Sequence, residues 1–420
     1  MRDRFRYIGQ WLSALMMVLL FTGCSKSSDS DSGGGGEEHK KPALRIYVFP
    51  PDQPIVTRAD NGNVNVSTEA EKKINNLHVW VFEHNNGKLV GHISLNNVDF
   101  SDTQSNQVLM ELDDALVSRI ENPTEDIYVD VYVAANVTST NCGITLDAST
   151  TRAQLEEKII DADHFGIKDG KYVNSVPADG LPMSGVMKNK KITGSSPVYQ
   201  VSEDGGGLAN VRLVRAVSKI RYVLSMSTTN PDEVTVNSIT LGCLQTETAE
   251  EIKVLPTTEY LFLDDAYDLS TTVKYKVGTD YENAKAISTN SDNSPIKRND
   301  SPASYSYVDG MSGQQYETII QDGINEGKLS DFGTYYLRES DKILTGTIKY
   351  TVKHTDAEKN GTSPVPEKTA TFAMHKVGDF SRNHTWIVYG YFVSSGNLLL
   401  NMVEIKNWSN IESPHDIYNW

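Results

Sequence analysis

The chain has 420 residues and a formal net charge of −16 at pH 7, from 55 acidic and 39 basic side chains. This acidic balance argues against nucleic acid as a partner, because binding to phosphates needs a basic surface. The length is enough for two domains of ordinary size. Twenty tyrosines, many Val, Ile and Thr residues, and scattered Gly, Asn and Asp turns favour β structure.

The N-terminus has the pattern of a bacterial lipoprotein export signal. Three arginines in the first six residues precede an apolar run at 11–21 that is too short for a permanent membrane anchor. The sequence that follows resembles a lipobox ending at Cys24, although Phe21 is a less usual residue at its position. We expect a signal peptide at 1–23, an acylated (palmitate-bearing) Cys24, and a flexible Ser/Asp/Gly-rich tether behind it. The alternative is a plain secretory signal with an incidental cysteine.

The stretch 44–59, LRIYVFPPDQPIVTRA, begins as a strand and ends at an arginine. Leu44, Ile46 and Val48 recur at period two, which predicts a half-buried strand. Prolines then end it, because proline has no N–H for a β-ladder. We interpret the strand as a removable plug: a trypsin-like protease cuts after Arg58, and a strand from another copy fills the groove. The alternative is an ordinary first strand followed by a loop.

Alternation predicts further strands along the rest of the chain. A capping box formed by Thr151 and Gln154 predicts one short helix. The segment 180–185 is expected to be a loop or short edge strand, and 288–306 a long surface loop. The strands are expected at 74–82, 89–95, 127–136, 211–226, 236–244, 259–263, 332–339, 344–354, 369–375, 386–393 and 397–405.

Two of these stretches bear on domain organisation. Ser202–Gly207 (SEDGGG) is the predicted domain boundary. If 211–226 is one continuous strand, it runs from this boundary into the second domain. Trp386–Val393 is apolar on both faces and is therefore expected to be a central strand.

The C-terminal tail joins a long apolar strand to a short aromatic end. Asn397–Ile405 (NLLLNMVEI) is followed by a polar link and by Asp416–Trp420 (DIYNW). Such a pair suits a donor arm that fills a partner's groove. The alternative is that the tail folds back into its own domain, and Asn401 leaves open which face would enter a groove. The predicted donor residues are Leu398, Leu399, Leu400, Met402, Val403, Ile405, Ile417, Tyr418 and Trp420.

The sequence offers no constellation for catalysis or for binding a metal or cofactor. None of the nine histidines has a metal-ligand spacing, and Ser184 lies outside a GxSxG motif. Acidic pairs such as Asp113-Asp114 are expected to be solvated turns rather than calcium ligands. We therefore predict no enzyme activity, no catalytic residue, no metal and no cofactor. Cys142 and Cys243 are expected to be buried thiols, although whether they pair is left open.

Two polar motifs are expected to be structural. The basic run of Arg215, Lys219 and Arg221 is predicted to pair with local carboxylates. Arg382-Asn383-His384 is predicted to satisfy turn backbone at the start of a strand.

Taken in order, these motifs resemble the fimbrillins, the shaft subunits of the type V pili of Bacteroidales. The fixed order over the whole chain carries the resemblance more than any single motif. The motifs are Cys24, Arg58-Ala59, Ile74–Phe82, Tyr132–Asn136 (YVAAN), Leu213–Ile220 (LVRAVSKI), Thr334–Glu339 (TYYLRE), Arg382-Asn383-His384 (RNH) and the terminal Trp420.

The resemblance implies an all-β fold of two transthyretin-like β-sandwich domains in tandem, with minor short helices. With the boundary predicted above, a propeptide at 24–58 precedes an N-terminal domain at 59–207 and a C-terminal domain at 208–420. The donor-strand tail then occupies about 397–420.

The resemblance also implies a structural pilin subunit of a cell-surface fimbria that supports adhesion. The precursor would be held at the outer membrane by lipid on Cys24. An arginine-specific protease would cut between Arg58 and Ala59, and subunits would join head to tail by donor-strand exchange. The implied partners are copies of itself or related pilins, and a host or bacterial surface ligand.

Alternatives from other classes stay open. One is an unprocessed surface lipoprotein that serves as the tip or anchor subunit of a pilus. Another is an adhesin that binds glycan or host protein. Shaft, tip and accessory roles are not separated by sequence.

Overall fold

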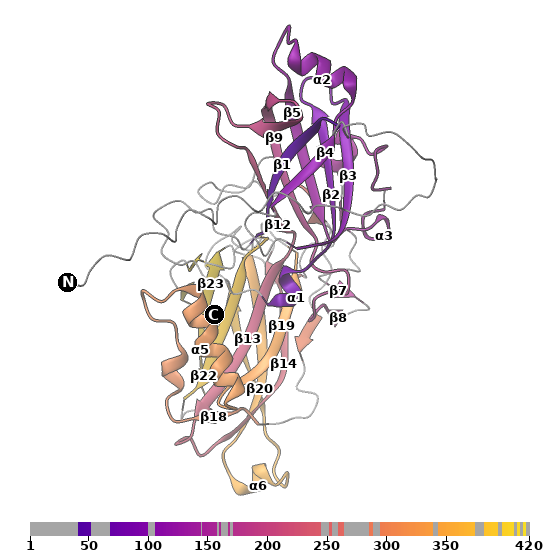
Figure 1. The fold of residues 1–420 in the computed structure, drawn as a ribbon. Coiled ribbons are helices and arrows are strands. Elements are labelled where there is room, and N and C mark those ends of the chain that lie inside the picture. The colour runs from indigo at the N-terminus through magenta and orange to yellow at the C-terminus, as the bar shows by residue number, and fades with distance from the viewer. Residues whose placement is uncertain are drawn as a thin grey trace, which may run out of the picture. The chain divides into compact units, whose positions relative to one another are not determined.

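The described part of the chain is mostly β-strand, arranged in three larger sheets (Figure 1). The predicted all-β class, with few short helices, is confirmed. Contacts group Lys41–Trp420 into one unit, apart from Met1–Lys40. No helix in the described segments is long and apolar enough to span a membrane. The computed structural model describes residues 41–51, 68–99, 106–143, 145–157, 159–160, 167–168, 171–244, 252–253, 259–263, 285–288, 295–338, 343–373, 382–393, 397–406, 410–411 and 415–416.

The first sheet has nine strands from the N-terminal half of the chain. These are β1 (Ala43–Phe49), β2 (Ile74–Glu83), β3 (Leu89–Val98), β4 (Gln107–Glu111), β5 (Tyr128–Ala135), β9 (Met183–Ser195), β10 (Val198–Ser202), β11 (Asn210–Arg212) and β12 (Val214–Arg215). The path runs β11-β1-β10-β9-β5-β2-β3, with β4 paired to β1 and β12 paired to β9. The predicted strands at 44–49, 74–82, 89–95 and 127–136 are confirmed as β1, β2, β3 and β5.

Short helices and paired segments decorate this region. The predicted capping box of Thr151 and Gln154 is present at the start of one helix. Asp113 caps another helix by accepting a hydrogen bond from the Leu116 N–H, so this carboxylate has a structural role. The elements are α1 (Glu69–Lys72), α2 (Asp114–Glu121), α3 (Ser139–Cys142), α4 (Arg152–Glu156), β7 (Ile167–Lys168) with β8 (Lys171–Tyr172), and β6 (Ile159–Ile160) with β16 (Glu259–Tyr260).

The second sheet has seven strands from the C-terminal half. These are β13 (Ser218–Ser227), β18 (Arg298–Asn299), β19 (Ser330–Leu337), β22 (Thr385–Phe392), β23 (Leu398–Lys406), β24 (Asn410–Ile411) and β25 (His415–Asp416). The path runs β18-β13-β22-β23-β24, with β19 paired to β13 and β25 to β23. β22 lies between β13 and β23 and is buried on both faces, so the predicted central strand is confirmed.

The third sheet packs against the second. Its strands are β14 (Glu233–Leu244), β15 (Ile252–Lys253), β17 (Lys285–Ser288), β20 (Ile343–Lys353) and β21 (Glu367–Ala373), and a small helix, α6 (Asp356–Lys359), follows β20. Both sheets contribute to one hydrophobic cluster. Within it the rings of Tyr222 and Phe372 lie 6.0 Å apart, and those of Tyr350 and Phe392 lie 5.0 Å apart. The C-terminal sheets therefore share a core.

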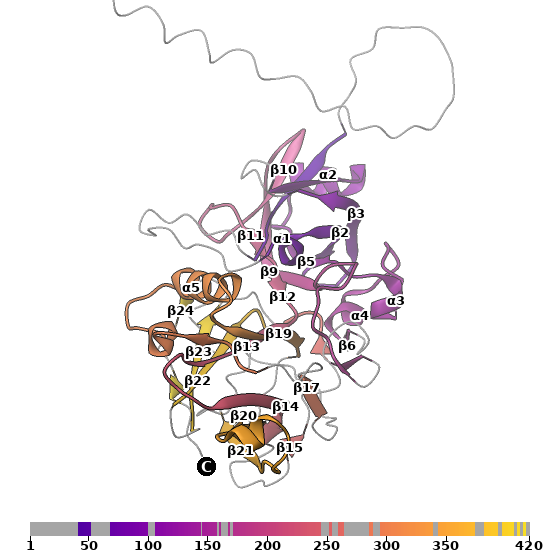
Figure 2. The same cartoon turned by 90° about the horizontal axis from the view of Figure 1, so that it is seen from below.

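A thirteen-residue helix, α5 (Gly313–Asn325), was not predicted from the sequence. It covers the face of the second sheet that points away from the third sheet (Figures 1 and 2). On this helix Glu317 accepts a hydrogen bond from Arg221 of β13 at 3.1 Å. Tyr316 and Ile320 are buried in the same cluster as Tyr389 of β22. The helix therefore protects a sheet face that water would otherwise reach.

Three loop or strand predictions need correction. Residues 183–185 are the start of β9, an interior strand, and form neither a loop nor a short edge strand. The expected continuous strand at 211–226 is divided into β11, β12 and β13, because the chain leaves one sheet and enters another. Part of the expected surface loop at 288–306 is packed: Ile296 and Asn299 are buried, and a 3-10 helix, η2, spans Pro302–Tyr305.

The predicted domain boundary is a turn inside the first sheet. Ser202 and Leu208 form an isolated bridge, and the Glu203 N–H donates to the Gly207 carbonyl at 2.8 Å. Both β10 before this turn and β11 after it pair with β1. The passage to the second sheet comes later, between Arg215 and Ser218.

Candidate strand-exchange site

β1 is hydrogen-bonded along both of its edges. On one side it pairs antiparallel with β4, from Ala43 opposite Glu111 to Tyr47 opposite Gln107. On the other side it pairs parallel, first with β10 through Arg45 and then with β11 from Tyr47. β1 therefore joins two strand edges that would otherwise both be open.

The side chains of β1 alternate as the sequence predicts. Leu44, Ile46 and Val48 are completely buried, whereas the residues between them are partly exposed. Burying one such aliphatic side chain stabilises the folded state by roughly 1.5–3 kcal/mol. The strand is thus held by three apolar side chains as well as by its two ladders.

The groove that holds β1 has apolar walls. β4 contributes Val108 and Met110, and β11 contributes Val211, all in one buried cluster with the β1 side chains. At the ends of the strand, the Ala43 N–H donates to the Pro197 carbonyl at 2.9 Å, and the Phe49 carbonyl accepts from the Leu213 N–H at 2.8 Å. Without β1, these walls and the ladder groups that face β1 would be exposed to water, which favours capture of another strand.

Gly185 of β9 lets β11 lie close beside this groove. A Cβ at this position would stand 2.4 Å from the Arg212 carbonyl oxygen and 2.6 Å from the Val211 side chain. We expect Gly185→Ala to lower the free energy of unfolding by about 1–3 kcal/mol, because the backbone of β11 must move. Urea unfolding measures the loss. Gly207→Ala is the control, since its Cβ would meet no atom within 4 Å; equal losses in both variants would contradict the prediction.

The predicted processing and lipid sites lie outside the described residues. This holds for Cys24, Arg58 and Ala59, so cleavage and lipidation stay predictions. β1 ends at Phe49, and the described chain resumes at Thr68, with the predicted cut between them.

The predicted donor strand pairs within its own chain. β23 pairs antiparallel with the whole length of β22, from Leu398 opposite Phe392 to Ile405 opposite Thr385. Leu398 is buried, Leu400 packs against the second core, and Leu399 is 43% exposed. Ile417, Tyr418 and Trp420 lie outside the described residues, as do the side chains of Met402, Val403 and Ile405.

The register of β23 assigns its faces, which the sequence left open. Leu398 and Leu400 lie on the face of the second core, whereas Leu399 between them is exposed on the opposite face. In sequence, positions 398, 400 and 402 repeat the spacing of the three buried residues of β1.

A buried charged cluster holds α1, the first described helix after the predicted cut. Glu71 is fully buried and lies 3.2 Å from the Lys219 ammonium of β13. The Tyr336 hydroxyl of β19 donates to Glu71 at 2.7 Å. Burial alone would raise the pKa of the Glu71 carboxyl, but Lys219 and the hydrogen bond from Tyr336 outweigh it and leave the pKa below its ordinary value. Thr68 caps α1 by accepting from the Glu71 N–H.

Two of the three residues of the basic run pair with carboxylates, as predicted: Lys219 contacts Glu71, and Arg221 contacts Asp331 at 2.8 Å. Arg215 instead donates to the Glu71 carbonyl. Arg382 donates to the carbonyls of Tyr260 and Leu261, so it satisfies backbone that is distant in sequence and not the turn before its own strand.

Asn136 is a structural residue that the sequence interpretation did not single out. It is buried with a positive φ of 57°. Its side-chain oxygen accepts from the Asn75 N–H at 2.8 Å, and its amide donates to the carbonyls of Lys73 and Leu181 at 2.8 and 2.9 Å. Asn tolerates this backbone conformation. Its place at the end of YVAAN was the available signal.

The polar residues singled out in the sequence have few ionisable neighbours in the described structure. No group of three His, Cys, Asp or Glu side chains among the described residues could hold a metal ion. The Ser184 hydroxyl donates to the Leu261 carbonyl. His78 and His92 have ring nitrogens 3.3 Å apart, and burial, followed by the charge of His92, lowers the pKa of His78 to about 4.

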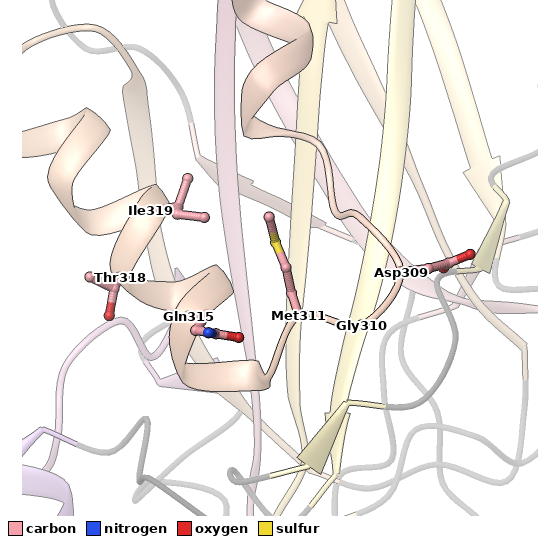
Figure 3. Close-up of a pocket in the computed structure, with 6 residues that line it drawn as sticks. All are labelled: Asp309, Gly310, Met311, Gln315, Thr318 and Ile319. Atoms are coloured by element: carbon pink, nitrogen blue, oxygen red, sulfur yellow. The ribbon is translucent and has the colours of Figure 1, made fainter.

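One surface depression, of about 600 Å³, lies at the start of α5 (Figure 3). Among the described residues that line it, Asp309 is the one ionisable side chain, and Met311 and Ile319 supply apolar surface. The other lining residues are Gly310, Gln315 and Thr318.

The fold and the site define a multi-sheet β protein whose first described strand closes an apolar groove. Residues 54–241 match the family model described as major fimbrial subunit protein (FimA). Over these residues the chain is similar to the major fimbrial subunit family, and the resemblance to the fimbrillins is confirmed. Among curated protein sequences no match is found.

Several solved structures are similar over most of this chain. The tip fimbrial protein Mfa3 from Porphyromonas gingivalis, with C-terminal truncation, is 11% identical and covers 90% of this chain and 100% of its own, with a TM-score of 0.40. A fimbrial assembly protein from Parabacteroides distasonis is 13% identical, with the same coverages and TM-score. The fimbrial anchor protein Mfa2 from P. gingivalis is 10% identical, covers 90% and 100%, and has a TM-score of 0.36. Likeness at these TM-scores supports no statement about function.

Proposed function

We propose that this protein is a structural subunit of a cell-surface fimbria that assembles by donor-strand exchange. The single observation that carries the proposal is β1 itself. It is a buried strand paired on both edges, and it lies just before an arginine in a polar stretch. The match of residues 54–241 to the model of the major fimbrial subunit protein supports the same role.

The physical sequence of events follows from the groove. Cutting after Arg58 severs the covalent link between β1 and the rest of the chain. β1 can then leave the groove. A strand from a second copy can form hydrogen bonds with the same two strand edges and place its apolar side chains where those of β1 were buried. Because donor and groove are different surfaces, each subunit fills the next one, and the contact does not close on itself. A filament results.

The C-terminal strand is the donor that fits best. Leu398, Leu400 and Met402 have the same spacing in sequence as Leu44, Ile46 and Val48. In the proposed assembly, the side chains at 398, 400 and 402 therefore enter the groove of the next subunit. β23 would first leave β22, with which it pairs inside its own chain. Its release is therefore part of the proposed assembly step.

Lipidation of Cys24 and export to the outer membrane complete the proposed pathway. They rest on the lipobox-like sequence and on the tether behind it. The arginine-specific protease acts on the exposed precursor, and the mature subunit begins at Ala59. The mature subunit binds its own copies or related pilins, and its adhesive ligand is a host or bacterial surface.

A tip or anchor subunit is the second candidate, because the sequence does not separate shaft, tip and accessory roles. A glycan-binding adhesin has less support: Trp80 and Trp386 are fully buried and cannot serve as sugar platforms.

The test is to digest the precursor with an arginine-specific protease and to follow its size. We expect wild-type protein to start at Ala59 and to form high-molecular-weight polymer, while Arg58→Ala stays monomeric. Arg45→Ala is the matched control and should behave as wild type, because Arg45 lies inside a paired strand. N-terminal sequencing, intact mass and light scattering give the readout. Polymer formed by Arg58→Ala in the presence of protease would refute the proposal.

A further inference from the structure

A buried strap, residues Leu213–Lys219, links the groove of β1 to the sheet that holds the C-terminal strand. Every residue of the strap is at most 4% exposed, including Arg215, Ser218 and Lys219. Such burial is unusual for a connection between sheets, since most connections run over the surface. The strap is therefore packed on all sides and cannot shift without disturbing its neighbours.

The front of the strap is attached to β1. The Leu213 N–H donates to the Phe49 carbonyl at 2.8 Å, and the preceding strand, β11, pairs with Tyr47–Phe49. Loss of β1 removes these partners together. The front of the strap would still pair with β9, where Val214 lies opposite Ser184, and the Ala216 N–H would still donate to the Pro182 carbonyl at 2.8 Å, just before β9.

The rear of the strap holds the turn that begins β22. The Val217 carbonyl accepts from the Asn383 N–H at 2.7 Å, and the His384 carbonyl accepts from the Lys219 N–H at 2.8 Å. The Ser218 hydroxyl donates to that same His384 carbonyl at 3.1 Å. Asn383 has a positive φ of 60°, a conformation that L-residues adopt only where the surroundings favour it.

Arg215, in the middle of the strap, connects α1 to the turn before β22. Its Nε donates to the Glu71 carbonyl and its Nη1 to the side-chain oxygen of Asn383, both at 3.3 Å. The side chain is fully buried, so its position is fixed by these partners and by packing. A displacement of the strap at Leu213 is therefore transmitted to Asn383, two residues before β22 begins.

β22 in turn is the pairing partner of the predicted donor strand. It pairs with β13 from Lys219 opposite Thr385 and with β23 along its own whole length. We propose that the strap couples occupancy of the groove to the pairing of β22 with β23, so that losing β1 weakens the hold on the C-terminal strand. The use of this coupling in assembly rests on the proposed function, but the coupling itself belongs to the uncut chain.

Hydrogen exchange in the uncut, full-length protein tests the coupling without protease or assembly. Val48→Ala removes the same atoms from β1 as Val79→Ala removes from β2, and both side chains are fully buried. We expect Val48→Ala to speed exchange in Thr385–Phe392 on the order of five- to tenfold more than Val79→Ala does.

The same measurement in two further backgrounds identifies the strap as the route. Arg215→Met removes the bridging guanidinium. Asn383→Gly keeps a residue that accepts positive φ and removes only the side-chain contact, so it serves where Arg215→Met fails to fold. In either background Val48→Ala should no longer affect β22 more than Val79→Ala does. Equal effects of the two valine variants in the wild-type background, or an unchanged difference in the Asn383→Gly background, would overturn the coupling.

These outcomes are separate from those of the polymerisation test. A failed exchange experiment leaves the pilin proposal standing, since donor release needs no relay. A failed polymerisation test leaves the coupling standing as a property of the monomer.

Discussion

Replacing Ile46 with aspartate is expected to leave the groove without its own strand. Ile46 is fully buried at the centre of β1, so the new carboxylate would lie among apolar side chains without a cationic partner placed for it. Burying an unpaired charge is among the most destabilising changes a core can receive, and we expect a loss of about 3–5 kcal/mol in the free energy of unfolding. Urea unfolding at neutral pH measures it.

Leu109→Asp is the matched control for this substitution. Leu109 lies on β4, opposite Arg45 of β1, but its side chain is 49% exposed. An aspartate there keeps its hydration, so the unfolding midpoint should stay close to that of the wild type. If Ile46→Asp also kept the wild-type midpoint, the strand would contribute little to the fold and the plug interpretation would fail.

A peptide should rescue the Ile46→Asp protein in trans. A synthetic peptide with the wild-type sequence of Lys41–Pro51 carries the apolar residues of β1 and its ladder groups, and a ligand that binds only the folded state raises stability. We expect the peptide to raise the thermal midpoint of Ile46→Asp in a concentration-dependent way. The same peptide with Ile46 replaced by aspartate should have no effect. Rescue would show that the groove accepts a strand that is not covalently joined to the protein.

Strands with a clear local pattern of apolar residues were predicted well. The points at which the chain passes from one sheet to another were not predicted. β1, β2, β5 and β22 have period-two or continuous apolar patterns over seven residues or more, and each formed the expected strand. The stretch from Val211 to Met226 is equally apolar, but it changes sheets at the strap. Periodicity records only which residues are buried, and the strap is buried too.

Two further differences between the prediction and the structure concern a glycine inside a strand and the capping box of a helix. Residues 180–185 were interpreted as a loop or short edge strand, yet β9 begins at Met183, and Gly185 lies where the backbone of β11 comes close. The helix α5 was overlooked because glycine and asparagine weaken its propensity. Its capping box, Ser312 with Gln315, and the one-turn spacing of Tyr316 and Ile320 were signals that could have identified it.

Only part of the groove that holds β1 was predictable from the sequence. The three buried residues of β1 follow from alternation, but its neighbours β4, β10 and β11 come from later parts of the chain. The contact between Glu71 and Lys219 joins residues 148 positions apart. No local pattern contains such a pair, because only the completed fold brings the two side chains together.

Lys219→Met is expected to be the second strongly destabilising change. It leaves the carboxylate of Glu71 buried with its main counter-charge removed, and breaking a buried pair in this way costs about 3–5 kcal/mol. Lys191→Met is the control, because the Lys191–Asp126 pair is largely exposed and contributes little. Chemical unfolding of both variants at pH 7 gives the comparison, and similar midpoints would contradict the prediction.

The pH dependence gives an independent check on the same pair. In the wild type the pKa of Glu71 is lowered, so its contribution to stability is present above the ordinary glutamate pKa and is lost as pH falls through the folded-state pKa. Without Lys219, burial is less opposed and the pKa rises. The stability gap between wild type and Lys219→Met should therefore narrow as pH falls from the raised Glu71 pKa of the variant to the lowered Glu71 pKa of the wild type. A gap that stays constant would mean that lost packing, not lost charge, causes the effect.

The double variant Glu71→Gln, Lys219→Met separates the pair from its surroundings. Glutamine keeps a polar group beside Tyr336 and at the cap of α1, but it leaves no buried charge at this position. The double variant should therefore be more stable than Lys219→Met alone, and the two losses should not add. This pair ties the first helix after the predicted cut to the second sheet. If β1 is to leave while the rest of the chain stays folded, the new N-terminal segment needs such an anchor, and a variant without it should lose folded subunit when cut.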